Sequence, residues 1–441
     1  SANTNSRSSM LHKNILFSGV LKAIGLITSL VIVPITINYL NDEVYGVWMT
    51  ITSVLYWITT FDIGLGNGMR NYLTEALSKG DTALGRSYLS TTLILLSLIA
   101  LTMGAALIYP LYSINFNSFF NTYAVSGADL RLAVIIAVAF TLMNFVLKNI
   151  GFIFVALQRY ALNDLLAISG NVISLIIIYI LTKVTSGSLV LVVLAYTLTS
   201  CVVYLLAAIP LFWKHPELKP SLRCFDKSLG KKIVGKGLGF FVIQISSCLV
   251  ILGAANFFIT QACGPAAVTT YNIAYKFFNL LVIAYTIVLA PMWNAYTDAY
   301  VKGDMLWIRA TFRKALLMWG LSVLGGAVML ALCNTFYKLW VGSMVEVPLS
   351  VSLCTLVYVC FFNLNNCVTY LINGLNKIFV QIIISLAVTA LYIISVYAIG
   401  GKLGIEGIVL SMAASYAVMS AVHLYQCYLL IGNKANGIWN K

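Results

Sequence analysis

The sequence has few charged residues. Only 9% of its 441 residues are charged, whereas 61% are apolar, and an ordinary soluble domain carries about 25% charged residues. A chain of this length has room for roughly three soluble domains of about 150 residues, whose surfaces its 40 charged side chains could not cover. The chain must therefore face lipid, which excludes a soluble enzyme, a nucleic-acid binder and a receptor with a single membrane anchor.

The sequence also lacks the spacing of a metal site or a disulfide framework. Its nine cysteines lie mostly within apolar runs and form no Cys-x-x-Cys pair or Cys/His pattern. We expect them to be small packing residues, and we expect no metal or other cofactor. We also expect no cleavable signal peptide, because the apolar run after Lys13 is too long and has no small-residue cleavage site.

What the sequence does contain is a series of long apolar runs. A helix needs about 20 residues to cross a bilayer core, and apolar windows between polar breaks predict twelve such helices. We therefore predict an all-α, polytopic membrane protein whose neighbouring helices are antiparallel. The predicted spans cover residues 14–40, 44–65, 87–109, 131–157, 161–182, 189–212, 237–260, 266–291, 312–334, 347–373, 378–399 and 407–430.

Lysine and arginine are divided unevenly between the two sides of these spans. The side that holds both termini carries 20 of them, and the opposite side carries only Arg131, Lys183, Lys338 and Lys402. The positive-inside rule then places both termini in the cytoplasm. The net charge of +14 is thus explained by membrane topology and does not indicate a nucleic-acid partner.

A polar loop pattern occurs twice along the chain. The pattern acidic-x3-Lys-Gly-Asp-x4-Arg covers residues 75–86 and recurs at 298–309, and at a slightly shorter offset Leu157-Gln158-Arg159 corresponds to Leu375-Asn376-Lys377. These matches predict two pseudo-symmetric lobes of six helices each, the arrangement of a transporter that alternates access. The predicted parts are an N-terminal lobe (1–212), a basic cytoplasmic linker (213–236) and a C-terminal lobe (237–441).

Three lysines lie deep within the predicted spans, where ionisable residues are costly and are therefore functional candidates. Helical spacing places polar side chains on the same faces as these lysines, which predicts the wall of a wet, positively charged cavity. Cations without buried carboxylate partners favour an anionic substrate, above all a phosphate or diphosphate. The candidate substrate-binding residues are Lys22, Lys148, Lys276, Asn144, Asn272, Asn279 and Asn366.

Each candidate also has an ordinary structural explanation. Lys22 and Lys148 lie about 12 to 14 Å from a helix end, a depth from which a lysine side chain can extend toward water. Lys276 is too deep for that. Asparagine commonly forms hydrogen bonds between membrane helices.

Residues 13–86 carry a distinctive series of motifs. An apolar first span ends in VPITINYL, a short turn with YG and W follows, and DIGLGNG leads to the acidic-x3-KGD loop. This series resembles the Wzx-type polysaccharide flippases of the multidrug/oligosaccharidyl-lipid/polysaccharide (MOP) exporter superfamily, whose fold is MATE-like. The remaining chain resembles them in span count, repeat and loop lengths.

The resemblance implies a bacterial inner-membrane protein without a catalytic residue. It would move undecaprenyl-diphosphate-linked repeat units of O-antigen (lipopolysaccharide), capsule or exopolysaccharide to the periplasmic leaflet. Its implied partners are the lipid-linked oligosaccharide, membrane lipid, and polysaccharide polymerase and chain-length machinery. Coupling to a proton or sodium gradient is implied as well. Asp62 is the candidate coupling group, although capping the helix end at Gly64 is an equally suitable role for it.

Two other functions stay open at this point. One is a MATE-like small-molecule antiporter, and the other is a membrane glycosyltransferase or polymerase. The scarcity of buried carboxylates argues against both, and the second would usually also need an outer domain.

Overall fold

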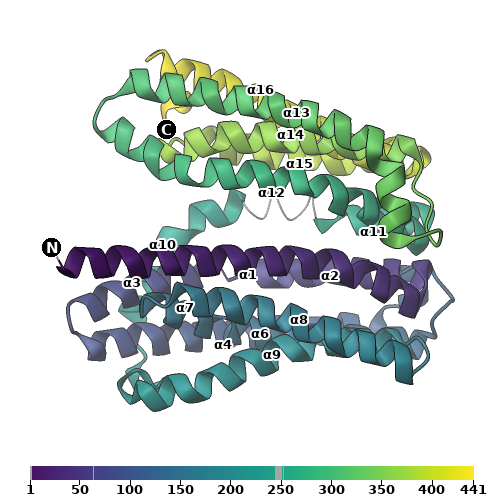
Figure 1. Cartoon of the computed structure of the whole chain (residues 1–441), viewed down its shortest axis with the longest axis horizontal. Coiled ribbons are helices and arrows are strands. Elements are labelled where there is room, and N and C mark those ends of the chain that lie inside the picture. The colour runs from purple at the N-terminus through teal and green to yellow at the C-terminus, as the bar shows by residue number, and fades with distance from the viewer. Residues whose placement is uncertain (1, 63, 244–250, 252) are drawn as a thin grey trace. The chain divides into compact units, whose positions relative to one another are not determined.

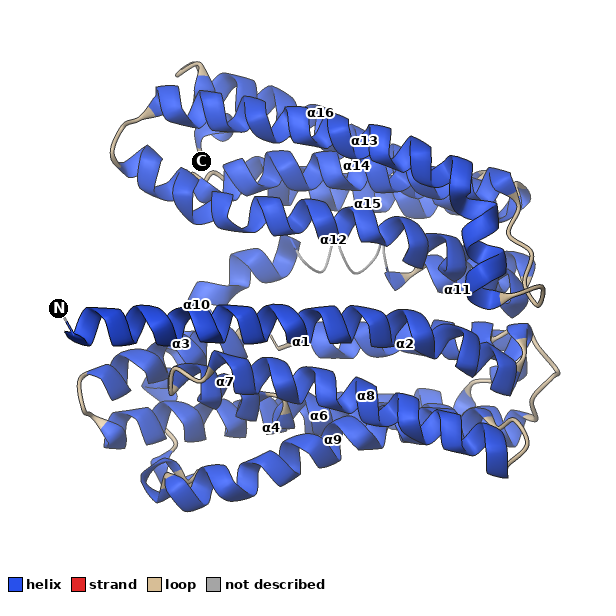
Figure 2. Cartoon of the chain, in the orientation of Figure 1, coloured by secondary structure: helices blue, strands red, loops and turns tan. Residues whose placement is uncertain are grey.

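The structure, a computed structural model, describes all residues except 1, 63, 244–250 and 252. The described residues form helices and connecting turns without any strand (Figure 2). They divide into two compact units, Ser1–Phe241 (unit 1) and Val242–Lys441 (unit 2).

Several helices of unit 1 begin at polar capping residues. The side chains of Asn41, Asp81 and Ser126 each accept a hydrogen bond from a backbone N–H in the first turn of the following helix, which is the usual N-cap arrangement. The helices are α1 (Ala2–Leu40), α2 (Asp42–Thr60), α3 (Leu65–Ser78), α4 (Thr82–Ser113), α5 (Phe116–Phe119), α6 (Gly127–Leu147), α7 (Asn149–Ala156), α8 (Tyr160–Val184) and α9 (Leu189–Lys214) (Figure 1).

Unit 2 is organised around α14, whose membrane-spanning stretch is more than half buried within the protein. Helices α12 and α16 pack on either side of it, and their shared core contains Tyr296, Leu371 and Cys427. The helices of this part are α11 (Ala255–Cys263), α12 (Pro265–Val301), α13 (Met305–Val341), α14 (Leu349–Gly374), α15 (Phe379–Ala398), η4 (Gly400–Lys402), α16 (Gly404–Ile431) and η5 (Gly437–Asn440).

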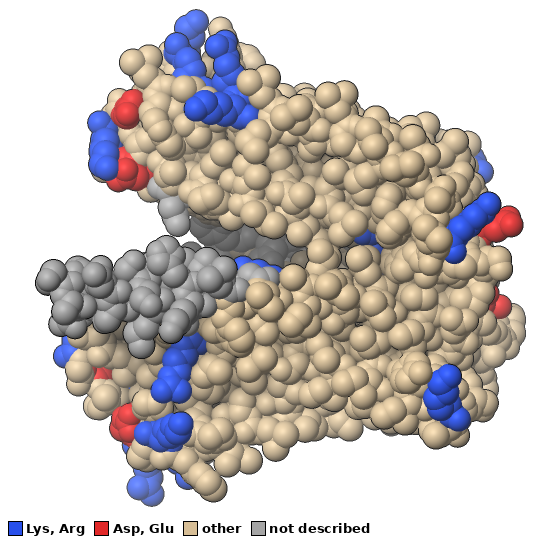
Figure 3. Space-filling model, in the orientation of Figure 1, with Lys and Arg blue, Asp and Glu red and all other residues tan. Residues whose placement is uncertain are grey.

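The surface of both units is suited to lipid. Within the described part of the chain, 10 helical segments are long and apolar enough to cross a membrane, and many large apolar side chains are exposed on them. On the face shown in Figure 3, charged side chains lie mainly toward the helix ends, and the stretches between carry few. The chain is therefore a multi-pass, all-α membrane protein.

Two of the twelve predicted spans are not among these ten segments. One is residues 44–65, where α2 already ends at Thr60. The other is residues 237–260, part of which lies outside the described residues.

Several helices extend beyond their predicted bounds. Helices α4, α12 and α13 continue past the apolar windows by several residues at one or both ends, because hydropathy marks only the lipid-facing part of a helix. The predicted loop 66–86 contains α3, and the predicted span 131–157 is interrupted at Lys148.

The segment after α9 packs against α4 within unit 1. It contains η1 (Pro216–Leu218), η2 (Leu222–Cys224) and the start of α10 (Lys227–Ile243). The backbone N–H of Ser221 donates to Ser90 Oγ at 3.1 Å, and the Arg86 Nε donates to the Lys219 carbonyl at 2.7 Å. The predicted linker thus docks along α4.

The two KGD loops have the same structure. Lys79 pairs with Glu75 at 2.6 Å, and Lys302 pairs with Asp298 at 2.6 Å. The glycine that follows each lysine has a left-handed φ, 74° at Gly80 and 73° in the second loop. The two loops that carry the repeated pattern therefore share one local structure.

Candidate functional site

The DIGLGNG motif forms the break between α2 and α3. Gly64 has a φ of 70° at the start of α3, a conformation that glycine adopts without strain. Asp62 stabilises this turn, because its Oδ1 accepts a hydrogen bond from the Gly64 N–H at 3.0 Å. Asp62 thus stabilises the turn before α3, whereas the N-cap residue of α3 is Gly64 and has no side-chain cap hydrogen bond.

The next glycine of the motif brings α3 close to α7. A Cβ atom on Gly66 would lie 2.6 Å from Asn149 Oδ1 and 2.7 Å from the Phe152 ring. A larger residue would push the two helices apart, so this position requires glycine for packing.

A second interruption separates α6 from α7 at Lys148. The Lys148 N–H still donates to the Asn144 carbonyl at 2.9 Å, but the Lys148 carbonyl accepts from Gly151 at 3.0 Å, one residue nearer than in a regular α-helix. The Asn149 side chain donates to the carbonyls of Phe145 and Val146. Its Oδ1 is buried and has no hydrogen-bond partner among the described residues.

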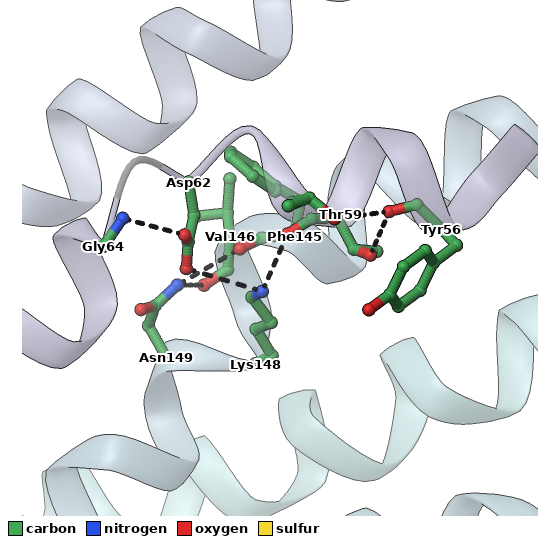
Figure 4. Close-up of polar contacts among 9 residues, drawn as sticks. Tyr56, Thr59, Asp62, Gly64, Phe145, Val146, Lys148 and Asn149 are labelled. Atoms are coloured by element: carbon green, nitrogen blue, oxygen red, sulfur yellow. Dashed lines mark hydrogen bonds and ion pairs between the residues drawn. The ribbon is translucent and has the colours of Figure 1, made fainter. Parts of the chain in front are cut away.

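These two interruptions meet at an ion pair (Figure 4). Lys148 Nζ lies 3.7 Å from Asp62 Oδ2 and donates to the Thr59 carbonyl at 3.3 Å. The ammonium also lies 5.6 Å from the centre of the Phe145 ring. Both side chains are partly accessible, 26% for Lys148 and 19% for Asp62. At 3.7 Å the pair is too long for a strong hydrogen bond, so the ammonium can take another anionic partner.

The structure joins two residues that the sequence assigned separately. Lys148 was a candidate for substrate binding and Asp62 for ion coupling. The expectation that the deep cations have no carboxylate partner is wrong for Lys148, because the break after α2 turns Asp62 toward α6. The glycines after Asp62 were the sequence signal for this break.

The other candidates of unit 1 have fewer contacts. Asn144 lies one turn before Lys148 on α6, and its Oδ1 is buried without a hydrogen-bond partner in the described part of the chain. Lys22 lies on α1 with an exposed side chain. It forms no ion pair with any described carboxylate.

Three candidates of unit 2 lie on α12. Asn272 donates to Asn256 Oδ1 at 2.9 Å and to the Val268 carbonyl at 2.8 Å, so it joins α11 to α12. Lys276 and Asn279 follow it along the helix with half-buried side chains.

Aromatic rings accompany these residues on α12. Tyr271 and Tyr275 are stacked at 5.8 Å, and Tyr275 lies 6.2 Å from Tyr358 on α14. Asn366, the remaining candidate, is half-buried further along α14.

Sequence reasoning missed a buried polar pair in unit 2. His423 on α16 has its Nδ1 3.0 Å from Asn365 Oδ1 on α14. Its Nε2 is buried and has no hydrogen-bond partner among the described residues. A single histidine in the last predicted span was the only signal for this contact.

Comparisons with known proteins agree with this picture. Residues 11–293 match the sequence pattern of a protein family described as "Polysaccharide biosynthesis protein". A Salmonella typhimurium protein named "Putative O-antigen transporter" is 23% identical over 409 residues, which cover 90% of this chain and 91% of that protein. The match to a named transporter agrees with the prediction of a transport protein that is not an enzyme.

Solved structures show the same fold. An inward-facing multidrug resistance MATE family transporter of the MOP superfamily superposes with a TM-score of 0.78 at 16% identity, covering 95% of this chain and 98% of that one. A MOP superfamily transporter from Pyrococcus furiosus gives a TM-score of 0.63 at 15% identity, with 96% and 97% coverage. The chain therefore has the predicted MATE-like fold.

Proposed function

The chain belongs to the family of polysaccharide biosynthesis proteins, and from this premise we propose that it is a flippase for lipid-linked oligosaccharides. The substrate we propose is an undecaprenyl-diphosphate-linked repeat unit of O-antigen, capsule or exopolysaccharide. It would cross a bacterial inner membrane by alternating access, with both termini of the chain in the cytoplasm. The relative named for O-antigen transport and the MOP superfamily fold support this proposal.

The observation that carries the proposal is the position of Lys148. Its ammonium lies at the junction of two interrupted helices, 3.7 Å from a carboxylate that also accepts a hydrogen bond from the Gly64 N–H in the turn before α3. A diphosphate that leaves water loses several kcal/mol or more unless cations and donors replace its hydration. Lys148 supplies such a cation at this junction.

Asp62 is suited to couple this cation to an ion gradient. A proton or a sodium ion on Asp62 would cancel its charge and release Lys148 for the diphosphate. The Gly64 N–H bond would persist, because a neutral carboxyl oxygen still accepts a hydrogen bond. Cation binding at Asp62 and anion binding at Lys148 would then strengthen each other, as linked sites do.

The remaining candidates are assigned within each unit by itself. In unit 1 we assign Lys22 to a further contact with the diphosphate and Asn144 to a polar contact with the substrate. In unit 2 we assign Lys276, Asn279 and Asn366 to polar contacts with the substrate. Asn272 already bonds to Asn256, so we assign it to holding α12 in place beside the substrate. Polysaccharide polymerase and chain-length machinery would receive the transported unit.

Export in a flippase-deficient strain that depends on this chain tests the role of Lys148. We expect Lys148→Ala to lose most glycan export at normal protein level, and Lys148→Arg to keep a substantial part because the charge is retained. The matched control is Lys183→Ala at the end of α8, whose ammonium lies over its own helix's Tyr179 ring. Full export by Lys148→Ala would reject the role.

The MATE transporter similarity makes a small-molecule antiporter the second candidate, since the fold match has a TM-score of 0.78. The same cells distinguish the two functions. A flippase restores the glycan without changing drug susceptibility, whereas an antiporter changes susceptibility and leaves the glycan absent.

A further inference from the structure

Unit 1 has a groove between the ends of α7, α8 and α9. Its volume is about 250 Å³, and its walls are mostly apolar, with Leu157, Leu162, Leu166, Ala207 and Leu211 among them. Leu162 and Leu166 lie one helical turn apart on α8, and Ala207 and Leu211 lie one helical turn apart on α9. The apolar wall therefore runs from the helix ends into the membrane-spanning part.

The mouth of this groove is cationic. Arg159 directly precedes α8, Lys214 is the last residue of α9, and both line the groove with exposed side chains. The nearby Glu217 carboxylate lies 3.0 Å from His215 Nδ1. Neither Arg159 nor Lys214 forms an ion pair with a carboxylate in the part of the chain that the structure describes.

In unit 2 the corresponding place is filled by the chain itself. The repeat offset of 218 places Lys377 where unit 1 has Arg159, and Lys377 Nζ donates to the Asn440 carbonyl at 3.0 Å. The Trp439 ring packs edge-on against Tyr425 of α16 at 5.2 Å. The η5 segment thus places an oxygen on the cation and an apolar ring against the helix wall.

Unit 1 has no such segment, because the chain after α9 turns toward α4. Leu218 is buried in a core cluster with Met69 and Leu89. Asp226 N–H donates to Thr91 Oγ1 at 2.9 Å. These contacts hold residues 218–226 against α4, and none of these residues lines the groove.

We propose that the groove of unit 1 binds an anionic glycerophospholipid. The phosphate lies on Arg159 and Lys214, and an acyl chain lies along Leu162, Leu166 and Ala207. The two cations lie at helix ends, which is the membrane depth of lipid headgroups, and the apolar wall of the groove lies at the depth of the acyl chains. Basic pockets between membrane helices bind anionic headgroups. Two cations without carboxylate partners favour a lipid with net negative charge over a zwitterionic one.

Lipid retention tests this proposal on the purified full chain. The protein is placed in nanodiscs of phosphatidylcholine and phosphatidylglycerol, transferred to mild detergent and examined by native mass spectrometry. We expect phosphatidylglycerol to be retained in preference to phosphatidylcholine by a factor on the order of tenfold. Arg159→Gln with Lys214→Gln should remove that preference. The matched variant Lys377→Gln in unit 2 should keep it.

A cross-linking experiment locates the lipid and remains valid if the double variant does not fold. Benzoyl-phenylalanine in place of Leu166 should cross-link phosphatidylglycerol in the otherwise unchanged chain. Equal retention of the two lipids by the wild type would overturn the proposal. Cross-linking to the chain itself, or to polyprenyl diphosphate in preference to phosphatidylglycerol, would overturn it as well.

Discussion

The two units share a repeat, yet they differ where unit 1 carries its ion pair. In unit 1 the helical structure is interrupted after α2 and after α6, and Asp62 and Lys148 meet at these interruptions. The repeat offsets of 223 and 218 place Tyr285 and Asn366 at the corresponding positions of unit 2. Helices α12 and α14 run through these positions without a break.

The difference teaches how a membrane helix can hold a charge. A continuous helix uses its backbone N–H and C=O groups internally, whereas an interruption leaves some of them available. In unit 1 the Gly64 N–H bonds to Asp62, and the Thr59 carbonyl bonds to Lys148. In unit 2 the Tyr285 hydroxyl donates to the Ala315 carbonyl at 2.8 Å, a neutral contact between the continuous helices α12 and α13.

The largest effect should come from reversing one charge of the pair. Lys148→Asp places two carboxylates together in a partly buried site, and we expect a loss of about 3 kcal/mol of stability. The double variant Lys148→Asp with Asp62→Lys restores opposite charges and should recover most of this loss. Thermal unfolding in detergent measures both. Equal unfolding temperatures for the wild type and Lys148→Asp would show that the ion pair does not contribute to stability.

A smaller effect is expected from filling the close approach of α3 and α7. Gly66→Ala adds a Cβ that would lie within 2.7 Å of both Asn149 and Phe152, so it should destabilise by about 2 kcal/mol. The offset of 223 places Leu289 at the corresponding position of unit 2, buried in a core cluster.

The two positions should therefore respond in opposite ways to residue size. Leu289→Ala should destabilise by leaving a cavity, whereas Gly66→Ala should destabilise by overpacking. The same unfolding measurement compares them. A stabilised Gly66→Ala protein would mean that the close approach of the two helices is not needed.

A further comparison concerns η5, which fills the place in unit 2 that corresponds to the groove of unit 1. Trp439→Ala removes the ring that packs on Tyr425 and should lower stability by about 1 kcal/mol. It should also open a second place for lipid, detected as additional lipid retained in native mass spectrometry. Unchanged lipid retention would show that the place filled by η5 is not equivalent to the groove of unit 1.

The smallest effect should be that of pH on the stability of the segment that docks on α4. The pKa of Glu217 is lowered below its ordinary value of 4.5 by its own backbone N–H and by the His215 side chain. A lowered pKa means that the stabilisation is present at neutral pH and is lost as the pH falls through the folded-state pKa. Glu217→Gln should remove this pH dependence. The measurement is the rate of proteolysis within residues 214–226 as the pH is lowered. Residues 432–441 of unit 2 contain no Asp or Glu side chain, so their protection should not change in the same way.

Much of the architecture could be predicted from the sequence. The length and number of apolar runs, the recurring KGD loops and the uneven lysine and arginine distribution predicted a two-lobed membrane transporter. These features are local or periodic, so a single chain displays them directly. Helix ends were less accurate, because polar turns of α4, α12 and α13 extend beyond the apolar windows.

The sequence by itself determined that this chain crosses the membrane many times, that it contains a repeat, and that Lys22, Lys148, Lys276 and Asp62 are the charged residues needing explanation. Only the tertiary structure decided that Lys148 faces Asp62 at two helix interruptions. It also decided that Asn272 bonds to Asn256. The reason is physical: hydropathy reflects the cost of placing each residue in lipid, whereas the partner of a polar group depends on which helices pack together and where their backbones break.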